Sequence, residues 1–169
     1  MKIIKTIKAW RWDVRGVLGI LVSCVLITFD QWIKHMVRLG VPYGESFPVI
    51  GQFLHITYVE NTGGAWSILQ GHTWFFLTIA AVLSVVALVT LLTKTHWMVR
   101  LAMALILAGG LGNAVDRIRL GAVVDFIECH FGSYVFPVFN FADMCICCGA
   151  VALGIYVVFI EQRLQREET

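Results

Sequence analysis

Four long apolar segments dominate the pattern of hydrophobic and polar positions along the chain. They cover residues 16–36, 74–92, 98–115 and 139–160, and their few charged residues lie near segment ends. About 20 apolar residues in a helix cross the hydrocarbon core of a bilayer. The pattern therefore predicts a membrane protein that is mainly α, with a bundle of four transmembrane helices. We expect residues 1–169 to form a single integral membrane domain.

The two connections at the predicted outer end of the helices have a strand-like pattern. In residues 47–59 apolar and polar side chains alternate imperfectly before the turn sequence Asn61-Thr62-Gly63-Gly64. Residues 122–127 and 134–139 are typical of two further strands around a Gly-Ser turn. We expect the outer loops 40–73 and 116–138 to form a small β-sheet and loop on this face. Non-helical backbone at that depth requires contacts with protein or with water in a cavity.

Composition excludes a water-soluble domain. The chain is 59% hydrophobic and 14% charged, and its mean hydropathy is +0.80. A soluble domain has about 25% charged residues. The net charge of +2 is too small to indicate a nucleic-acid partner.

The N-terminal segment has an amphipathic pattern. On a helix over residues 1–15, the isoleucines and Trp10 share one face and the lysines another, which predicts an interfacial basic helix. The alternative is the charged start of a cleaved signal peptide, because Leu21-Val22-Ser23-Cys24 has the form of a lipobox. However, the apolar run continues past Cys24 to Phe29, which favours a spanning helix.

Basic residues near the ends of the spans predict the orientation, since they concentrate on the cytoplasmic side. With the N-terminus inside, inner segments hold nine and outer segments hold four. The inner ones are Lys2, Lys5, Lys8, Arg11, Arg15, Lys94, Arg100, Arg163 and Arg166, and the outer ones are Lys34, Arg38, Arg117 and Arg119. We therefore expect both termini to be cytoplasmic. Within the third span, Ala104, Ala108 and Gly112 predict close helix packing.

Polar residues from distant parts of the sequence converge on the predicted outer face. Charged groups close to hydrocarbon are costly and often mark function. The set lies at outer helix ends or in outer loops and consists of Asp30, Asn61, Asn113, Asp116, Arg117, Asp125, Asn140 and Asp143.

Some of these residues have structural alternatives. Asp143 can complement a helix dipole, and Asn140 can be the N-cap of that helix with Asp143 as its N3 acid. Asp30 is well placed for an ion pair with Lys34 four residues on.

Asp116 and Arg117 are also candidates for structural ion pairs, at the end of the third helix. Asp125 is harder to explain structurally, because it lies in the apolar strand sequence VVDFI at 123–127. Burial there raises its proton affinity.

The pair Asp125 and Asp143 best supports hydrolytic chemistry. Two carboxylates held together in a partly dry site share one proton, so that one acts as a base and the other donates a hydrogen bond. The chain has no HExxH motif and no serine or cysteine nucleophile with a matching histidine motif. The cysteines and histidines lack ligand spacing, so we expect no metal, cofactor or disulfide. The candidate function is a membrane-embedded aspartic peptidase.

Two other classes of protein remain as alternatives. A small transporter or proton channel can use intramembrane acids as a relay, but such proteins more often show repeats or acids near span midpoints. A purely structural membrane subunit leaves Asp125 without a role.

Five stretches resemble one known family. They are Asp30-Gln31 with Lys34, NTGGAWS at 61–67, GNAVDR at 112–117, GAVVDFI at 121–127 and FNFAD at 139–143. In this order they resemble the bacterial lipoprotein signal peptidases (signal peptidase II). The resemblance implies that Asp125 and Asp143 are the catalytic dyad. Trp66 and Trp32-Ile33 depart from the family pattern and bear on pocket shape only.

The resemblance also implies a substrate and a supporting set of residues. The reaction is removal of a prolipoprotein signal peptide just before a cysteine that carries a diacylglyceryl group. Membrane lipids and globomycin-type peptide antibiotics are further implied partners. The expected setting is the bacterial inner membrane, with the active site toward the outer face and the enzyme a monomer. The residues expected to line or support the site are Asp30, Lys34, Asn61, Gly63, Asn113, Asp116, Arg117, Asn140 and Ala142.

Overall fold

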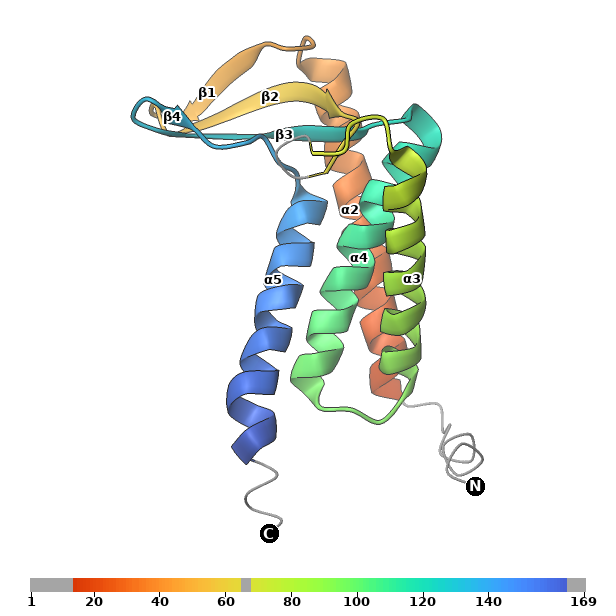
Figure 1. Cartoon of the computed structure of the whole chain (residues 1–169). Coiled ribbons are helices and arrows are strands. Elements are labelled where there is room, and N and C mark those ends of the chain that lie inside the picture. The colour runs from red at the N-terminus through yellow and green to blue at the C-terminus, as the bar shows by residue number, and fades with distance from the viewer. Residues whose placement is uncertain (1–13, 65–67, 164–169) are drawn as a thin grey trace.

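Four long helices and a small sheet make up the computed structural model, which describes residues 14–64 and 68–163. The helices are α2 (Val14–Gly40), α3 (Thr73–Leu92), α4 (Trp97–Leu120) and α5 (Phe141–Ile155), which a π-helical turn, η2 (Tyr156–Glu161), prolongs. Each is long and apolar enough to cross a membrane, with α5 and η2 as one span. The predicted fold class is confirmed (Figure 1). Most of the predicted interfacial helix, residues 1–13, lies outside the described residues.

Helix α4 is the centre of the bundle and packs against the other three helices. Away from the sheet the contact is apolar, because Ala87 and Leu91 of α3 form a buried cluster with Val99, Met103 and Leu107 of α4. Large apolar side chains also cover much of the outer helix surface. Such a surface is stable against lipid and not against water. The buried carboxylates, the buried amides and Lys34 lie at the sheet end, whereas Arg100 is buried near the opposite end of α4.

Small residues bring α4 close to its neighbours, as their spacing predicted. A Cβ added at Gly109 would lie 2.2 Å from the Ala142 carbonyl oxygen of α5. A Cβ at Gly112 would lie 2.7 Å from Asp30 Oδ2 of α2. The Ser23 hydroxyl of α2 also donates a hydrogen bond of 2.9 Å to the Ala104 carbonyl. Between Ala104 and Gly112, α4 is therefore in close contact with both α2 and α5.

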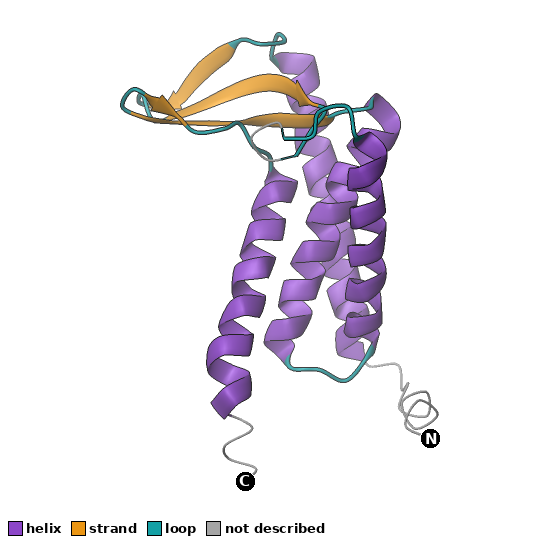
Figure 2. Ribbon diagram, viewed as in Figure 1, coloured by secondary structure: helices purple, strands orange, loops and turns teal. Residues whose placement is uncertain are grey.

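A four-stranded antiparallel sheet lies across the end of the bundle where α4 ends and α5 begins (Figures 1 and 2). Its order is β1 (Ser46–Ile50), β2 (Leu54–Asn61), β3 (Val123–Phe131) and β4 (Tyr134–Val135). The 47–59 pattern is therefore two strands, joined by a turn with Gly51 at φ 52°. Strand β4 ends at Val135 and is shorter than the predicted strand 134–139. Of the remaining residues of that segment, Phe139 forms an isolated β-bridge with Ile127.

The end of α4 differs from the sequence expectation. The helix continues one turn beyond Val115 to Leu120 and stops at Gly121, which has φ 79°. Asp116 and Arg117 are therefore on the helix and not in an outer loop. Glycine adopts this left-handed conformation without strain and commonly ends helices. From there the chain turns directly into β3.

Candidate active site

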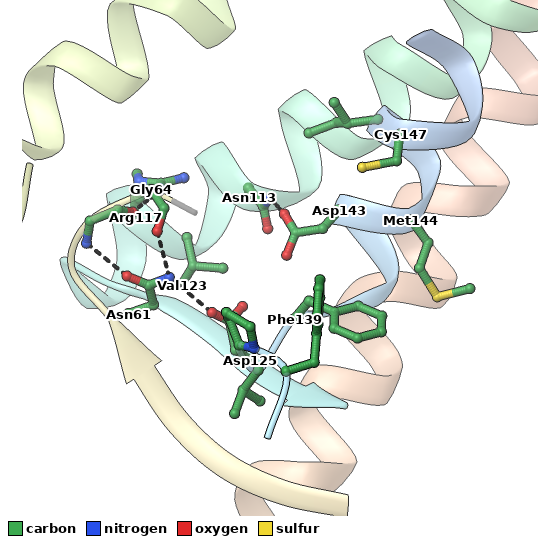
Figure 3. A pocket seen from close by; sticks show the side chains of 15 residues that line it. Asn61, Gly64, Asn113, Arg117, Val123, Asp125, Phe139, Asp143, Met144 and Cys147 are labelled. Atoms are coloured by element: carbon green, nitrogen blue, oxygen red, sulfur yellow. Dashed lines mark hydrogen bonds between the residues drawn. The ribbon is translucent and has the colours of Figure 1, made fainter. Parts of the chain in front are cut away.

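Asp125 and Asp143 meet at one cavity of about 440 Å³ beneath the sheet (Figure 3). Asp125 comes from β3 and Asp143 from the first turn of α5. Asn61, Asn113 and Arg117 are the other polar side chains on the cavity wall. The remaining lining is Gly63, Gly64, Val123, Phe136, Pro137, Val138, Phe139, Met144, Ile146 and Cys147. The cavity therefore presents two carboxylates within a mainly apolar wall.

Asp125 is buried in the first half of β3, between apolar neighbours, and exposes 3% of its surface. Asn61 Nδ2 donates to its Oδ2 at 3.0 Å, and Asn140 Nδ2 donates to its Oδ1 at 2.6 Å. Burial, followed by the nearby charge of Asp143, raises the pKa of Asp125 to about 6. This carboxyl therefore takes up a proton at a much higher pH than an exposed aspartate does.

Asp143 is held by the N-terminus of α5. Its Oδ2 accepts from the Asn140 backbone N–H at 3.1 Å, and its own N–H donates to Asn140 Oδ1 at 3.0 Å. This capping box confirms the predicted cap. Its Oδ1 accepts from Asn113 Nδ2 at 2.7 Å. Both carboxylate oxygens of Asp143 are therefore fixed by N–H donors at the start of α5.

Asn140 combines the two roles that the sequence left as alternatives. Its side-chain oxygen caps α5, while its Nδ2 reaches Asp125 and also Asn113 Oδ1 at 3.2 Å. The residue is fully buried. Because this one side chain donates to the Asp125 carboxylate and accepts from the Asp143 backbone N–H, it fixes the relative position of the two aspartates.

A buried ion cluster lies behind the cavity, between α2 and α4. Lys34 Nζ is 2.9 Å from Asp30 Oδ2 and 2.8 Å from Asp116 Oδ2. The predicted Asp30–Lys34 pair is therefore present. Asp116 also forms an ion pair, with Lys34, and its Oδ2 accepts from the Val124 backbone N–H at 3.3 Å. Asp30 Oδ1 accepts from the Ala142 backbone N–H at 3.0 Å. The cluster thus joins α2 to α4, α5 and β3.

The turn after β2 is fixed to α4 by Asn61 and Arg117. Asn61 Oδ1 accepts from the Gly63 N–H at 2.9 Å, and its Nδ2 also donates to the Gly64 carbonyl at 3.1 Å. Arg117 Nη2 donates to the Gly63 carbonyl at 2.7 Å, and its guanidinium lies 4.7 Å from the centre of the Phe76 ring. These contacts bring the end of β2 to the cavity.

The predicted residues fall into two groups. The cavity wall includes Asn61, Gly63, Asn113, Arg117, Asp125 and Asp143, whereas Asp30, Lys34, Asp116, Asn140 and Ala142 lie outside the lining and support it through the contacts above. Gln31 stood in one of the five family stretches, but the sequence assigned it no role in the site. Its Nε2 donates to Asp116 Oδ1 at 2.9 Å and to the Gly112 carbonyl at 3.1 Å. Its place beside Asp30 was the available signal. Apart from its hydrophobicity, nothing in the sequence of residues 136–139 indicated that this segment lines the cavity.

No group of three or more His, Cys, Asp or Glu side chains is placed to hold a metal ion within residues 14–64 and 68–163. All five cysteines belong to this part of the chain and are free thiols. Among the described residues, the cavity wall offers two carboxylates, two amides, one guanidinium and the thiol of Cys147 as chemical groups.

Known proteins agree with this architecture. A family model described as signal peptidase (SPase) II matches residues 22–159. The lipoprotein signal peptidase of Anoxybacillus flavithermus is 40% identical over 145 residues, which cover 84% of this chain and 86% of the relative. The corresponding protein of Geobacillus thermodenitrificans is 37% identical over 147 residues, covering 86% and 92%.

Solved structures give the same result for the fold. One bacterial membrane enzyme structure superposes with a TM-score of 0.79 at 32% identity and covers 90% of this chain and 93% of its own. Another gives a TM-score of 0.76 at 34% identity, covering 85% and 94%. The chain therefore belongs to the signal peptidase II (lipoprotein signal peptidase) family, and it is a multi-pass membrane aspartic peptidase.

Proposed function

We propose that Asp125 and Asp143 are the catalytic dyad, and that they hydrolyse the bond just before the diacylglyceryl-modified cysteine of prolipoproteins. The observation that carries this proposal is the meeting of both carboxylates at one largely apolar cavity. Each carboxylate accepts two N–H donors, so its oxygens are held in place before substrate binds. Groups that are held in place before the reaction need no reorganisation at the moment of reaction.

The chemistry follows from one proton shared between the two carboxyl groups. The protonated carboxyl donates a hydrogen bond to the scissile carbonyl, while the ionised one removes a proton from water. The water oxygen then bonds to the carbonyl carbon and forms a tetrahedral intermediate. Its collapse breaks the C–N bond as a proton passes to the leaving amine. The raised pKa of Asp125, about 6, supports a dyad that still holds a proton close to neutral pH.

The apolar wall suits a lipid-modified substrate. Residues 136–139 with Met144, Ile146 and Cys147 supply hydrocarbon and sulfur surface beside the carboxylates. Each acyl CH₂ group that leaves water for such a surface contributes about 0.8 kcal/mol. The same cavity is the proposed site for globomycin-type peptides, and the bundle surface is the proposed contact with membrane lipids. The distribution of basic residues supports cytoplasmic termini and an outward-facing site. We propose that the enzyme is a monomer in the bacterial inner membrane.

A paired-substrate assay tests this function. Purified protein in detergent is given one prolipoprotein in two forms, with and without the diacylglyceryl group on its cysteine. We expect cleavage of the lipidated form to be faster by about a hundredfold or more, since the apolar wall binds the acyl chains. Equal rates would contradict the proposed specificity for lipidated substrates. If neither form were cleaved, the proposed function would be contradicted.

The raised pKa of Asp125 predicts the pH dependence. Because the dyad needs its proton, kcat/KM should fall as pH rises through the pKa of Asp125, near 6 in the free enzyme. The hydrogen bond from Asn61 lowers this pKa, so Asn61→Ala raises it. We expect the alkaline limb to move upward by roughly half to one pH unit. A limb that stays or moves downward contradicts the assignment.

The matched control for this pH experiment is Tyr58→Phe. It also removes a side-chain hydrogen bond from β2, since the Tyr58 hydroxyl donates to Glu60 at 2.5 Å. This bond is exposed and involves neither aspartate. The pH profile of Tyr58→Phe should therefore match that of the wild-type protein.

A further inference from the structure

The buried ion cluster behind the cavity has Lys34 between two carboxylates. The Lys34 ammonium is 2.9 Å from Asp30 Oδ2 and 2.8 Å from Asp116 Oδ2. All three side chains are buried, and none of them lines the cavity. A buried ion pair is costly to desolvate and is by itself weak evidence for stability. The role of the cluster therefore has to be sought in what its carboxylates hold in place.

Asp30 holds the start of α5. Its Oδ1 accepts from the Ala142 backbone N–H at 3.0 Å. The capping box of this helix uses the N–H groups of Asn140 and Asp143 and leaves that of Ala142 open. Ala142 directly precedes Asp143, so the contact with Asp30 fixes the backbone that carries Asp143.

Asp116 holds β3 in the same way. Its Oδ2 accepts from the Val124 backbone N–H at 3.3 Å, and its Oδ1 accepts from Gln31 Nε2 at 2.9 Å. Val124 is fully buried and directly precedes Asp125. The contact with Asp116 therefore fixes the backbone that carries Asp125. Each carboxylate of the cluster thus holds the residue before one member of the dyad.

Resting on the proposed dyad, we propose that Lys34 is a positioning residue that sets the separation of Asp125 and Asp143. These two aspartates come to the cavity from different elements, β3 and α5 (Figure 3). The path of contacts between their backbones runs through both carboxylates of the cluster and meets at the single ammonium of Lys34. An ammonium suits this place, because it is compact and has three N–H donors.

The cluster adds a second link between the aspartates to the one that Asn140 makes. Asn140 joins the Asp125 carboxylate to the Asp143 backbone N–H. The cluster joins the same two segments at other atoms, the N–H groups of Val124 and Ala142. One link holds two segments at a point, and a second link prevents them from pivoting about it. Catalytic groups need such support, since a displacement of about 1 Å lowers the rate by about a hundredfold.

The first test is Lys34→Met, which keeps a side chain of similar length and removes the charge and the donors. We expect kcat for a lipidated prolipoprotein to fall by about 10- to 100-fold. The loss is smaller than for the dyad itself, because Gln31 still donates to both carboxylates. KM should change little, since Lys34 does not line the cavity. A role in stability alone lowers Tm and leaves both constants of the folded enzyme unchanged. Wild-type kcat for folded Lys34→Met overturns the proposal.

A neutral version of the cluster covers the case in which unpaired carboxylates prevent folding. Lys34→Met combined with Asp30→Asn and Asp116→Asn leaves no charge in the cluster, and such replacements are often neutral for stability. Each amide oxygen can still accept the backbone N–H of Ala142 or Val124, whereas the ammonium that joins the two sides is lost. We expect the same fall in kcat with little change in KM. Wild-type kcat in this variant also overturns the proposal.

A double-mutant cycle tests the path itself. Asp30→Ala removes the contact with Ala142 and should lower kcat by about tenfold on its own. If Lys34 acts through Asp30, adding Asp30→Ala to Lys34→Met should cause little further loss, because the path is already broken. Independent effects would instead multiply. Multiplied losses therefore overturn the proposal.

The matched control is Ser23→Ala on the same helix. The Ser23 hydroxyl donates to the Ala104 carbonyl at 2.9 Å, so this change also removes a buried hydrogen bond between α2 and α4. Neither residue adjoins a dyad aspartate. Ser23→Ala should lower Tm and leave kcat and KM at their wild-type values. A fall in kcat equal to that of Lys34→Met would show that any loosening of α2 against α4 suffices, and would overturn the proposal.

Failure of the proposed function gives a different result. In that case Asp125→Asn and Asp143→Asn cleave the lipidated substrate at the wild-type rate, whatever Lys34→Met does. If only the role of Lys34 is wrong, those two variants are inactive and Lys34→Met keeps its wild-type kcat.

Discussion

Replacing Asp125 or Asp143 with asparagine is expected to lower kcat for a lipidated prolipoprotein by about a thousandfold or more. Either change removes one proton-transferring group, and such groups contribute about 10²–10⁴ each. An amide can neither take a proton from water nor share the proton of its partner. The measurement is initial cleavage rate with purified wild-type and variant proteins at equal, folded concentration.

The effect of Asp125→Asn on the stability of the folded protein should change sign with pH. The pKa of Asp125 is raised in the folded protein, from 3.8 to about 6, so ionisation destabilises the fold as pH rises through this range. The cost above pH 6 is about 3 kcal/mol. Asparagine removes it, but accepts only one of the two hydrogen bonds from Asn61 and Asn140, a loss of about 1 kcal/mol. We expect a higher Tm than wild type at pH 7 and a lower one at pH 4.

The matched control is Glu128→Gln on the same strand. Glu128 pairs with His130 and does not line the cavity. Its replacement should leave the cleavage rate unchanged. If Asp125→Asn or Asp143→Asn were as active as Glu128→Gln, the dyad assignment would be wrong. A lower Tm at pH 7 for Asp125→Asn would instead contradict the proposed cost of keeping an ionised Asp125 buried.

Gly109→Ala is expected to separate α4 from α5 and to damage both stability and catalysis. The added Cβ would lie 2.2 Å from the Ala142 carbonyl oxygen and 2.7 Å from an Ile146 side-chain carbon. Such overpacking costs about 1–3 kcal/mol. Ala142 precedes Asp143, so any shift of α5 lengthens the 2.7 Å contact between Asn113 and Asp143. A misplacement of about 1 Å lowers catalysis by about a hundredfold.

Gly110→Ala is the control on the next residue of the same helix. A Cβ there meets nothing within 4 Å, and alanine is favoured over glycine in a helix by about 1 kcal/mol. We expect equal or higher Tm and an unchanged cleavage rate. Equal behaviour of the two variants would show that the close contact at Gly109 does not position the site.

Much of the fold follows from the sequence because a bilayer restricts what can cross it. Twenty apolar residues in a row have few alternatives to a helix, so the spans were predictable. The end of α4 was not, since Asp116 and Arg117 interrupt the apolar pattern. The helix continues because Lys34 pairs with Asp116 and the Gly63 carbonyl accepts from Arg117. Gly121 was the better signal for its end.

The residues of the site were predictable from the sequence, but most of the contacts that join them were not. Charged and amide residues near hydrocarbon need partners, and this placed Asp125, Asp143 and Asn140 in one group. Spacing along the chain also predicted the Asp30–Lys34 pair. The contact between Lys34 and Asn113 joins residues 79 positions apart, and no local pattern predicts which amide atom faces an ammonium. Such long-range orientation depends on how α2 and α4 pack.

The most direct test of the central claim is the mass of the products formed from a lipidated prolipoprotein. We predict one cut, which yields a fragment that begins with the diacylglyceryl-modified cysteine and an intact signal peptide. Asp125→Asn and Asp143→Asn should yield neither product in the same time. A cut at another bond, or the same products from both variants at the wild-type rate, would contradict the account.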